Sequence, residues 1–207
     1  MFYTNADRAI KAMNRENLKR FGRLKLMRHD ELNIVREVKT VYDQAVRDAE
    51  NWYLEIARLA YADALRKCGT ESSEARKRAK RRIGMDWVLL YLMENDPLTL
   101  YQFIAEADRK KQRLIEALSA TQSPSQEVDK ALRYWAGQTG QYAISITDAA
   151  TIQAFKDAGI KKVIWHTEHD DRVCKDCEPL DGQVFDIDEI PVKPHLGCRC
   201  WIEPVIE

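Results

Sequence analysis

The sequence of 207 residues contains no apolar run of the length that a membrane span requires. A bilayer-spanning helix needs about 18 or more consecutive apolar residues, and charged or polar residues interrupt every apolar stretch of this chain well before that length. The first residues, MFYTNADRAIK, also lack the basic-then-apolar pattern of a secretory signal. These absences argue against a membrane protein and predict a soluble chain that is synthesised in a cytosol.

The motifs that carry common enzyme chemistry are absent as well. The sequence has no glycine-rich phosphate loop, no nucleophile elbow and no recognisable pair of catalytic carboxylates. We therefore predict that the protein is not an enzyme.

Cysteine is scarce over most of the chain and crowded near one end. Of five cysteines, Cys68 stands alone, whereas Cys174, Cys177, Cys198 and Cys200 lie close together in sequence. In a reducing compartment such crowding favours a bound metal over disulfides. Cys68 has no nearby partner in sequence and is predicted to be a structural thiol.

The formal net charge of zero hides an uneven distribution. Residues 1–122 hold 24 Lys and Arg against 18 Asp and Glu, whereas residues 123–207 hold 9 against 15, so the two parts carry +6 and −6. The run RKRAKRR at 76–82 would surround a helix with cations instead of forming one stripe. It predicts a surface that touches phosphates or carboxylates without reading bases; the alternative is two ordinary solvated surfaces.

The first two thirds of the chain have the pattern of helices. Apolar residues from Val35 to Leu59 follow a 3-4 alternation that predicts one long helix, which Gly69 and Thr70 end. Ser72 or Ser73 would cap a second helix that continues into WVLLYLM. Asp96 and Pro97 would begin a third helix that ends near Leu118. The expected architecture is a long N-terminal helical hairpin or bundle.

The segment SATQSPSQ is the clearest break, and we place a domain boundary there, between residues 1–122 and 123–207. Ser123 and Gln126 have the spacing of a capping box. A short helix is expected near 128–135, and a second one near 142–157, which Gly159 ends. KKVIWHT then has the composition of a strand, followed by turns and short strands. The predicted fold class is mainly α with a small α+β C-terminal domain that a zinc ion staples.

The cysteines of this C-terminal part have the spacing of a zinc site. Cys174 and Cys177 form a C-x-x-C pair, and His195, Cys198 and Cys200 follow as a second group. Two such pairs converge on a tetrahedral ion and close it, which would make a structural site. Five candidates compete for four places. Because residues two apart in a strand point to opposite faces, we expect Cys174, Cys177 and His195 with either Cys198 or Cys200, unless the backbone curls.

The same segment resembles the C-terminal signature of the phage head morphogenesis family, the Mu F-like minor head proteins. In that family an aromatic-containing strand leads to D-x-R-x-C-x-x-C, then to a Leu-Asp-Gly turn, and then to H-x-x-C-R-C. The matching positions are Asp170, Arg172, Cys174, Cys177, Leu180, Asp181, Gly182, Pro191, Pro194, His195, Cys198, Arg199 and Cys200. The resemblance covers residues 125–207, with departures at Thr147-Asp148 and Val192-Lys193-Pro194 that touch no proposed ligand.

The resemblance implies a minor head protein of the virion, present in few copies near the portal vertex. It implies a structural role in procapsid assembly and in DNA packaging or ejection, with the phage portal protein as partner. Scaffolding or capsid protein would be further partners, non-specific DNA contact an accessory, and no membrane would be involved.

Two other functions compete with this interpretation: a zinc-dependent nucleic-acid-processing enzyme and a DNA-binding zinc module. His166 and Glu168 before Cys174 superficially echo the H-x-E and C-x-x-C halves of nucleobase deaminases, but the two halves are too close together. His166 and His169 are alternative metal ligands, although such histidines more often lie at the surface. Arg172 with Asp170 or Asp171 is predicted to form an ion pair that orients the metal loop.

Overall fold

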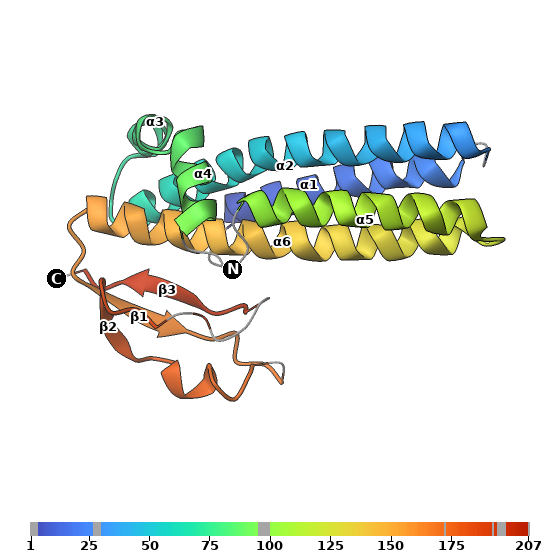
Figure 1. Cartoon of the computed structure of the whole chain (residues 1–207). Helices are drawn as coiled ribbons and strands as arrows, with labels where there is room; N and C mark the ends of the chain where they lie inside the picture. The colour runs from blue at the N-terminus through green and yellow to red at the C-terminus, as the bar shows by residue number, and fades with distance from the viewer. Residues whose placement is uncertain are drawn as a thin grey trace. The chain divides into compact units, whose positions relative to one another are not determined.

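The computed structural model describes residues 4–26, 30–94, 100–171, 173–191, 193 and 198–206. In these residues six α-helices precede a small antiparallel sheet (Figure 1). The elements are α1 (Thr4–Gly22), α2 (Glu31–Lys67), α3 (Ser72–Arg82), α4 (Met85–Glu94), α5 (Leu100–Ala120), α6 (Pro124–Asp157), β1 (Lys162–His166), β2 (Val184–Asp186) and β3 (Trp201–Pro204), with 3-10 turns at Arg23–Lys25 and Glu178–Leu180. The predicted class, mainly α with a small α+β part, is confirmed. Among the described residues, no helix has the length and apolar content to cross a bilayer.

The chain forms two compact units, and each is assembled from separate stretches of sequence. Unit 1 contains Met1–Ala6, Ile56–Ile83 and Ile144–Glu207, and unit 2 contains Asp7–Glu55 and Gly84–Ala143. Helices α2 and α6 therefore contribute residues to both units. The predicted boundary after residue 122 coincides with the beginning of α6, and separate folding of the two sides stays a prediction.

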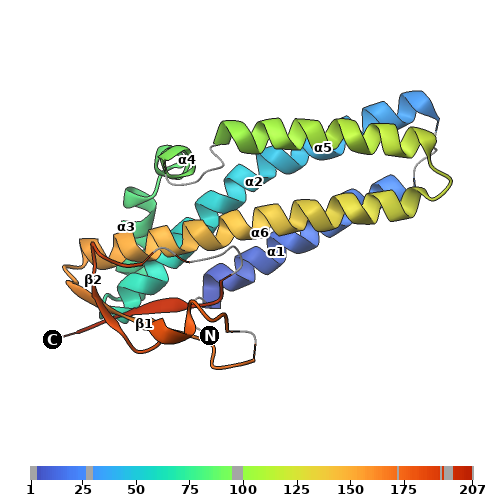
Figure 2. The ribbon, with the colours of Figure 1, turned by 60° about the horizontal axis from the view of Figure 1, so that its bottom comes forward.

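In unit 2, stretches of α1, α2, α5 and α6 run side by side, as both views show (Figures 1 and 2). An aromatic cluster joins three of these helices: Phe21 lies 5.2 Å from Tyr42, and Tyr42 lies 5.7 Å from Trp135, between ring centroids. Both contacts are edge-on, the arrangement that aromatic quadrupoles favour. On α5, Lys111 pairs with Asp43 of α2 at 3.0 Å. The core of this unit is therefore a helical bundle, as the sequence predicts.

The apolar stripe of α2 is the feature that the sequence predicts best. Five of its members are between 0 and 3 % exposed: Val38, Tyr42, Ala45, Ala49 and Ile56. Val35, Trp52 and Leu59 are half-buried. A stripe of this width is what a helix buries on its neighbours.

Glycines end the two longest helices where the sequence predicts. Gly69 follows α2 with φ +85°, and Gly159 follows α6 with φ +78°. After each, the chain reverses with the same hydrogen bonds: Gly69 N–H donates to Arg66 O and the next N–H donates to Leu65 O, both at 3.0 Å. This is the Schellman arrangement, in which the left-handed position is strained for residues that carry a Cβ.

The predicted single helix from Ser72 through WVLLYLM is wrong, because the chain breaks at Ile83 and Gly84 into α3 and α4. Ile83 has an extended backbone and is fully buried. Arg58 Nε donates a hydrogen bond to the Ile83 carbonyl oxygen at 2.9 Å, and this contact replaces a helical hydrogen bond. The predicted cap is also shifted by one residue. Glu71 is the N-cap, and its carboxylate accepts the backbone N–H groups of Ser73 and Glu74.

The predicted break inside residues 123–157 is wrong as well, since α6 runs unbroken from Pro124 to Asp157 through Gly137 and Gly140. A glycine inside a helix costs about 1 kcal/mol relative to alanine, which tertiary packing readily offsets. Trp135 and Tyr142, on either side of the glycines, are 2 % and 4 % exposed and supply that packing. In place of the expected Ser123–Gln126 side-chain box, Gln126 N–H donates to the Ser123 carbonyl at 3.1 Å. The expected cap at Asp96 and Pro97 lies outside the described residues.

The sheet of unit 1 has the order β2-β1-β3, with both pairings antiparallel. The strand predicted from KKVIWHT is confirmed as β1. Its residues Val163 and Trp165 point to one face and are 0 % and 1 % exposed, as the alternation of a half-buried strand requires. In the register with β3, His166 lies opposite Trp201.

Asp157, at the end of α6, joins three helices of unit 1. Its carboxylate accepts hydrogen bonds from Tyr61 Oη of α2 at 2.7 Å and from Arg82 Nε of α3 at 3.0 Å, besides one from Gln153. Partial burial by itself raises the pKa of Asp157, but these donors stabilise the carboxylate and the resulting pKa lies below that of an ordinary aspartate. Burial and the bond to Asp157 raise the pKa of Tyr61 to about 12. The network therefore depends on a charged Asp157.

We expect Asp157→Asn to lower the free energy of unfolding by about 1–3 kcal/mol at pH 7, because it weakens charge-assisted hydrogen bonds. A carboxylate whose pKa is lowered by folding stabilises the protein above its unfolded pKa of about 3.9 and loses this contribution as the pH falls through the folded value. The difference between variant and parent, measured by urea unfolding, should shrink below about pH 4. Asp188→Asn is the control, since Asp188 is 76 % exposed beside Lys156. A pH-independent difference for Asp157→Asn would contradict this account.

Candidate metal centre

Strand pairing brings the two cysteine groups to the same end of the sheet. Because β1 and β3 are antiparallel and His166 lies opposite Trp201, the loop that leaves β1 and the segment that enters β3 adjoin each other. Cys174 and Cys177 belong to that loop, while Cys198 and Cys200 belong to that segment. The register of two strands therefore brings together residues more than twenty positions apart.

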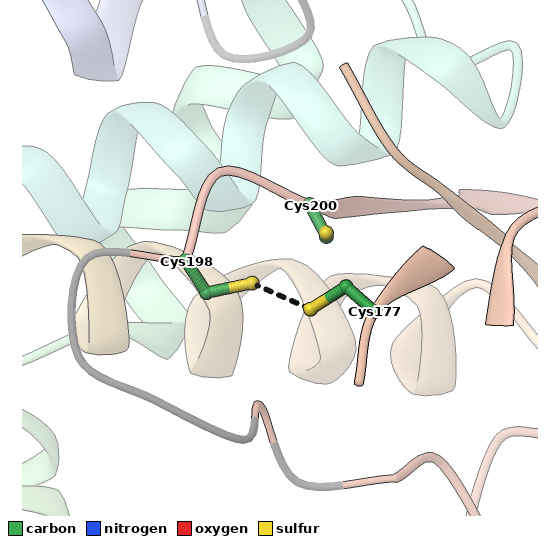
Figure 3. A group of neighbouring side chains, drawn as sticks. All are labelled: Cys177, Cys198 and Cys200. Carbon is green, nitrogen blue, oxygen red and sulfur yellow. Dashed lines mark hydrogen bonds between the residues drawn. The ribbon is translucent and has the colours of Figure 1, made fainter. Parts of the chain in front are cut away.

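Three thiols converge at this point. The sulfur atoms of Cys177, Cys198 and Cys200 all lie within 4.8 Å of one another, and those of Cys177 and Cys198 are 3.5 Å apart (Figure 3). Their residues are 1 %, 3 % and 6 % exposed. In a tetrahedral site with metal–sulfur bonds of about 2.3 Å, neighbouring sulfurs are about 3.8 Å apart. The three buried cysteines can therefore hold a metal ion with little rearrangement.

Cys174 adjoins this group through a tight turn. The backbone N–H of Cys177 lies 3.3 Å from the sulfur of Cys174 and 3.1 Å from its carbonyl oxygen. The thiol of Cys174 also interacts with the thiol of Cys177. Cys174 is half-buried, unlike the other three. A thiol that accepts a backbone N–H in this way is prepared for the charged form that metals bind.

The electrostatics of the cluster fit a cation. Burial raises the pKa of Cys177, and the neighbouring thiols of Cys174, Cys198 and Cys200 raise it further. Burial also raises the pKa of Cys200. Thiolates packed so closely repel one another, so the apoprotein keeps Cys177 and Cys200 protonated at neutral pH. A thiophilic dication removes that repulsion by binding thiolates directly.

The expectation that Cys198 and Cys200 point to opposite faces is wrong. It would hold only if the backbone between them were extended, and the backbone curls there. Residues 198–200 precede β3, which begins at Trp201, and they have no strand conformation. The backbone curls between the two cysteines, and both side chains turn toward Cys177 (Figure 3). The alternation rule holds only for an extended strand. His195 lies outside the described residues.

Arg199, between the two cysteines, clamps the halves of the site together. Its guanidinium donates to both carboxylate oxygens of Asp170, at 2.7 and 2.5 Å. The sequence predicts an ion pair of Arg172 with Asp170 or Asp171, but Arg172 lies outside the described residues. The sequence pattern predicted no structural role for Arg199, although this residue lies between the two cysteines of C-R-C. A bidentate pair fixes orientation better than a single contact, so this clamp aligns the loop after β1 with the segment before β3.

The Leu-Asp-Gly turn holds the other side of the loop. Asp181 accepts hydrogen bonds from the backbone and hydroxyl of Thr167, at 2.7 and 3.1 Å. Gly182 has φ +73°, and its N–H donates to the carbonyl of Trp165 at 2.8 Å. This left-handed position explains the glycine. The turn is thereby fixed to the end of β1.

The two upstream histidines make other contacts. His166 Nε2 lies 3.5 Å from a carboxylate oxygen of Glu203, and its ring stacks on Trp201 at 5.6 Å. His169 Nε2 lies 3.6 Å from Asp181, and it has φ +52°. Among the described residues, neither histidine has a ring nitrogen close enough to the three sulfur atoms to join their group. The geometry does not join His166 to the cysteines as a deaminase site requires.

Residues 57–203 match the model of the family described as Phage Mu protein F like protein. The chain belongs to this Mu F-like family. The match covers more than two thirds of the chain and begins in α2, far before residue 125 where the resemblance in sequence was recognised. Its range includes all of α3 to α6 and the entire thiol cluster. No curated protein and no solved structure matched the chain.

We expect Cys177→Ser to abolish stoichiometric metal binding by this Mu F-like chain, because Cys177 is the thiol that approaches all the others. Metal content after purification under reducing conditions without chelator measures this directly. Cys68→Ser is the matched control, since Cys68 is a free, half-buried thiol that does not belong to the cluster. Equal metal content in both variants, or no metal in the parent, would contradict a metal centre here.

Proposed function

We propose that this chain is a minor head protein of a phage, associated with the portal and structural in its role. Membership in the Mu F-like family over residues 57–203 is the observation that carries the proposal. The range includes helical segments and the thiol cluster together, so the proposal concerns both units. The protein would act during procapsid assembly and in DNA packaging or ejection, and it would reside in the virion near the portal vertex.

We propose further that the cluster holds one structural zinc ion. The buried sulfur atoms of Cys177, Cys198 and Cys200 supply three ligands, and their identity favours a thiophilic ion. A fourth protein ligand would close the tetrahedron, which leaves no position for a substrate or an activated water. A closed site supports a structural role instead of the alternative, a zinc-dependent nucleic-acid-processing enzyme. When bound, the ion would contribute free energy of folding to a sheet of three short strands.

Cys174 is the fourth ligand that we propose. Cys174 lies in the turn that directly precedes Cys177, and its sulfur already accepts the N–H of that residue. The convergence of both Cys198 and Cys200 removes the need for a histidine that the expected set contained. The ligand set that we propose is therefore Cys174, Cys177, Cys198 and Cys200.

Cobalt substitution tests this ligand set. Replacing the zinc by Co²⁺ gives thiolate-to-metal charge-transfer absorption whose intensity increases with the number of thiolates. We expect His195→Gln to leave this absorption and the metal affinity within about threefold of the parent, whereas Cys174→Ser should weaken binding by about 10-fold or more. The opposite ranking of the two variants would assign the fourth position to His195. Both variants change one potential ligand and keep the remaining cluster.

The portal protein is the partner that we propose first, with scaffolding or capsid protein as further partners. Co-expression of the chain with the portal, scaffolding and capsid proteins of the same phage genome tests this. We expect the chain to co-purify with portal rings and to enter procapsids in few copies. Arg36→Gln, a change at an exposed position far from the cluster in sequence, is a control that should leave incorporation unchanged.

Cys177→Ser should reduce incorporation, because the C-terminal part of unit 1 would lose its metal. If procapsids assembled in the presence of the parent chain contain none of it, the head-protein assignment would be overturned. Incorporation that depends on the capsid protein but not on the portal would move the contact to the shell.

A further inference from the structure

Helix α3 carries the densest positive charge of the described chain. Six of its eleven residues are Lys or Arg and one is Glu, which leaves a net charge of +5. Its two alanines, Ala75 and Ala79, lie four residues apart and are 0 % and 2 % exposed, so they form the buried face. The cations occupy the rest of the circumference. Arg76, Lys77, Lys80, Arg81 and Arg82 are exposed, and Arg78 is half-buried.

Three of these arginines line a concavity within unit 1. It has a volume of about 420 Å³, it opens to solvent, and its lining consists of Tyr61, Arg78, Arg81, Arg82 and Asp157. The lining comes from α2, α3 and the end of α6, which lie beside one another in Figure 2. Three guanidinium groups against one carboxylate leave a surplus of two positive charges in this concavity.

Contacts to the end of α6 hold two of the arginines in place. Arg82 Nε donates to the Asp157 carboxylate at 3.0 Å, and Arg78 Nη2 donates to the Asp157 carbonyl oxygen at 3.2 Å. Each guanidinium has five N–H donors, so most of its donors remain for a ligand. Arg81 is 76 % exposed, and its ion pair with Glu74 measures 3.9 Å. Arginines fixed in this way are pre-organised for a phosphate, which their planar forks match.

Outside the concavity, the exposed face of α3 continues the same charge. Among the described residues, Arg76, Lys77 and Lys80 have no ion pair or side-chain hydrogen bond. This face offers no apolar or aromatic side chain, since both alanines are buried. Stable protein interfaces rely on buried aromatic and apolar anchors, which this face lacks. A uniform line of phosphates requires only cations.

We propose that α3 and the concavity beside it form a binding site for the phosphate backbone of double-stranded DNA. A phosphate enters the concavity between Arg78, Arg81 and Arg82, and neighbouring phosphates contact Lys77 and Lys80. These contacts are made to phosphates, which carry no sequence information of their own. None of the residues that line the concavity belongs to the thiol cluster, and DNA binding at α3 goes beyond the head-protein role proposed above.

The experiment measures binding of the metal-loaded full chain to a duplex of about 25 base pairs by fluorescence anisotropy, between about 50 and 200 mM NaCl. Lys77→Glu with Arg81→Glu should weaken binding by about tenfold or more and reduce the slope of log K against log salt by about 2, one for each lost phosphate contact. Lys11→Glu with Lys39→Glu is the matched control, because both positions are exposed on other helices and the change in net charge is identical. The control should weaken binding by less than about threefold.

Several results would overturn the proposal. Equal weakening by the two charge reversals would reduce the effect to net charge. Displacement of DNA by poly-glutamate as effective as displacement by a second DNA duplex would indicate an acidic protein partner instead. Displacement by inorganic phosphate at matched ionic strength would indicate a site for free phosphate. The absence of measurable binding at low salt would remove the site altogether.

Circular dichroism checks that the variants are folded. Arg81→Gln alone provides the second variant, because it removes one charge from a largely exposed side chain. It should reduce the salt slope by about 1 with the helical spectrum unchanged. An unchanged slope in this folded variant would also contradict the proposal.

Discussion

The antiparallel pairing of β1 with β3 determines where the thiols lie. In this register the end of one strand adjoins the beginning of the other, so two loops that leave the sheet at that end must run together. A slip by one residue would turn Trp165 away from the core face, where it is almost fully buried. The burial of one aromatic side chain and the convergence of the cysteines are thus consequences of the same register.

Bringing the thiols together is energetically unfavourable, and the surrounding contacts offset part of this cost. Buried thiols that must ionise to bind a metal are unfavourable without it, and the strands are only five, three and four residues long. The pair between Asp170 and Arg199 and the hydrogen bonds of Asp181 tie both loops to the sheet. These contacts reduce the conformational entropy that a metal would otherwise have to remove. A metal bound at this cluster would therefore order the same loops as the polar clamps.

The elements that local chemistry determines could be predicted from the sequence. Gly69 and Gly159 end helices because a left-handed residue is required there, and the stripe of α2 follows from helical period alone. The breaks depend on distant partners and could not be predicted. Arg58 of α2 donates a hydrogen bond to the carbonyl oxygen of Ile83, after α3. Packing around Trp135 keeps α6 helical through two glycines. At the metal centre the residue types and spacing indicated the donors, but the curl before β3, which brings Cys198 and Cys200 together, is set by tertiary structure.

The composition of unit 1 has a consequence for the order of folding. Its residues come from the beginning of α1, the middle of the chain and the last third, so its core contacts close loops of very different length. The bond from Asn5 to Asp63, at 2.7 Å, and that from Tyr61 to Asp157 already span 58 and 96 positions. Contacts so distant in sequence pay their closure entropy before they return any stability. These contacts of unit 1 should therefore form after the turns of its own helices, which close locally.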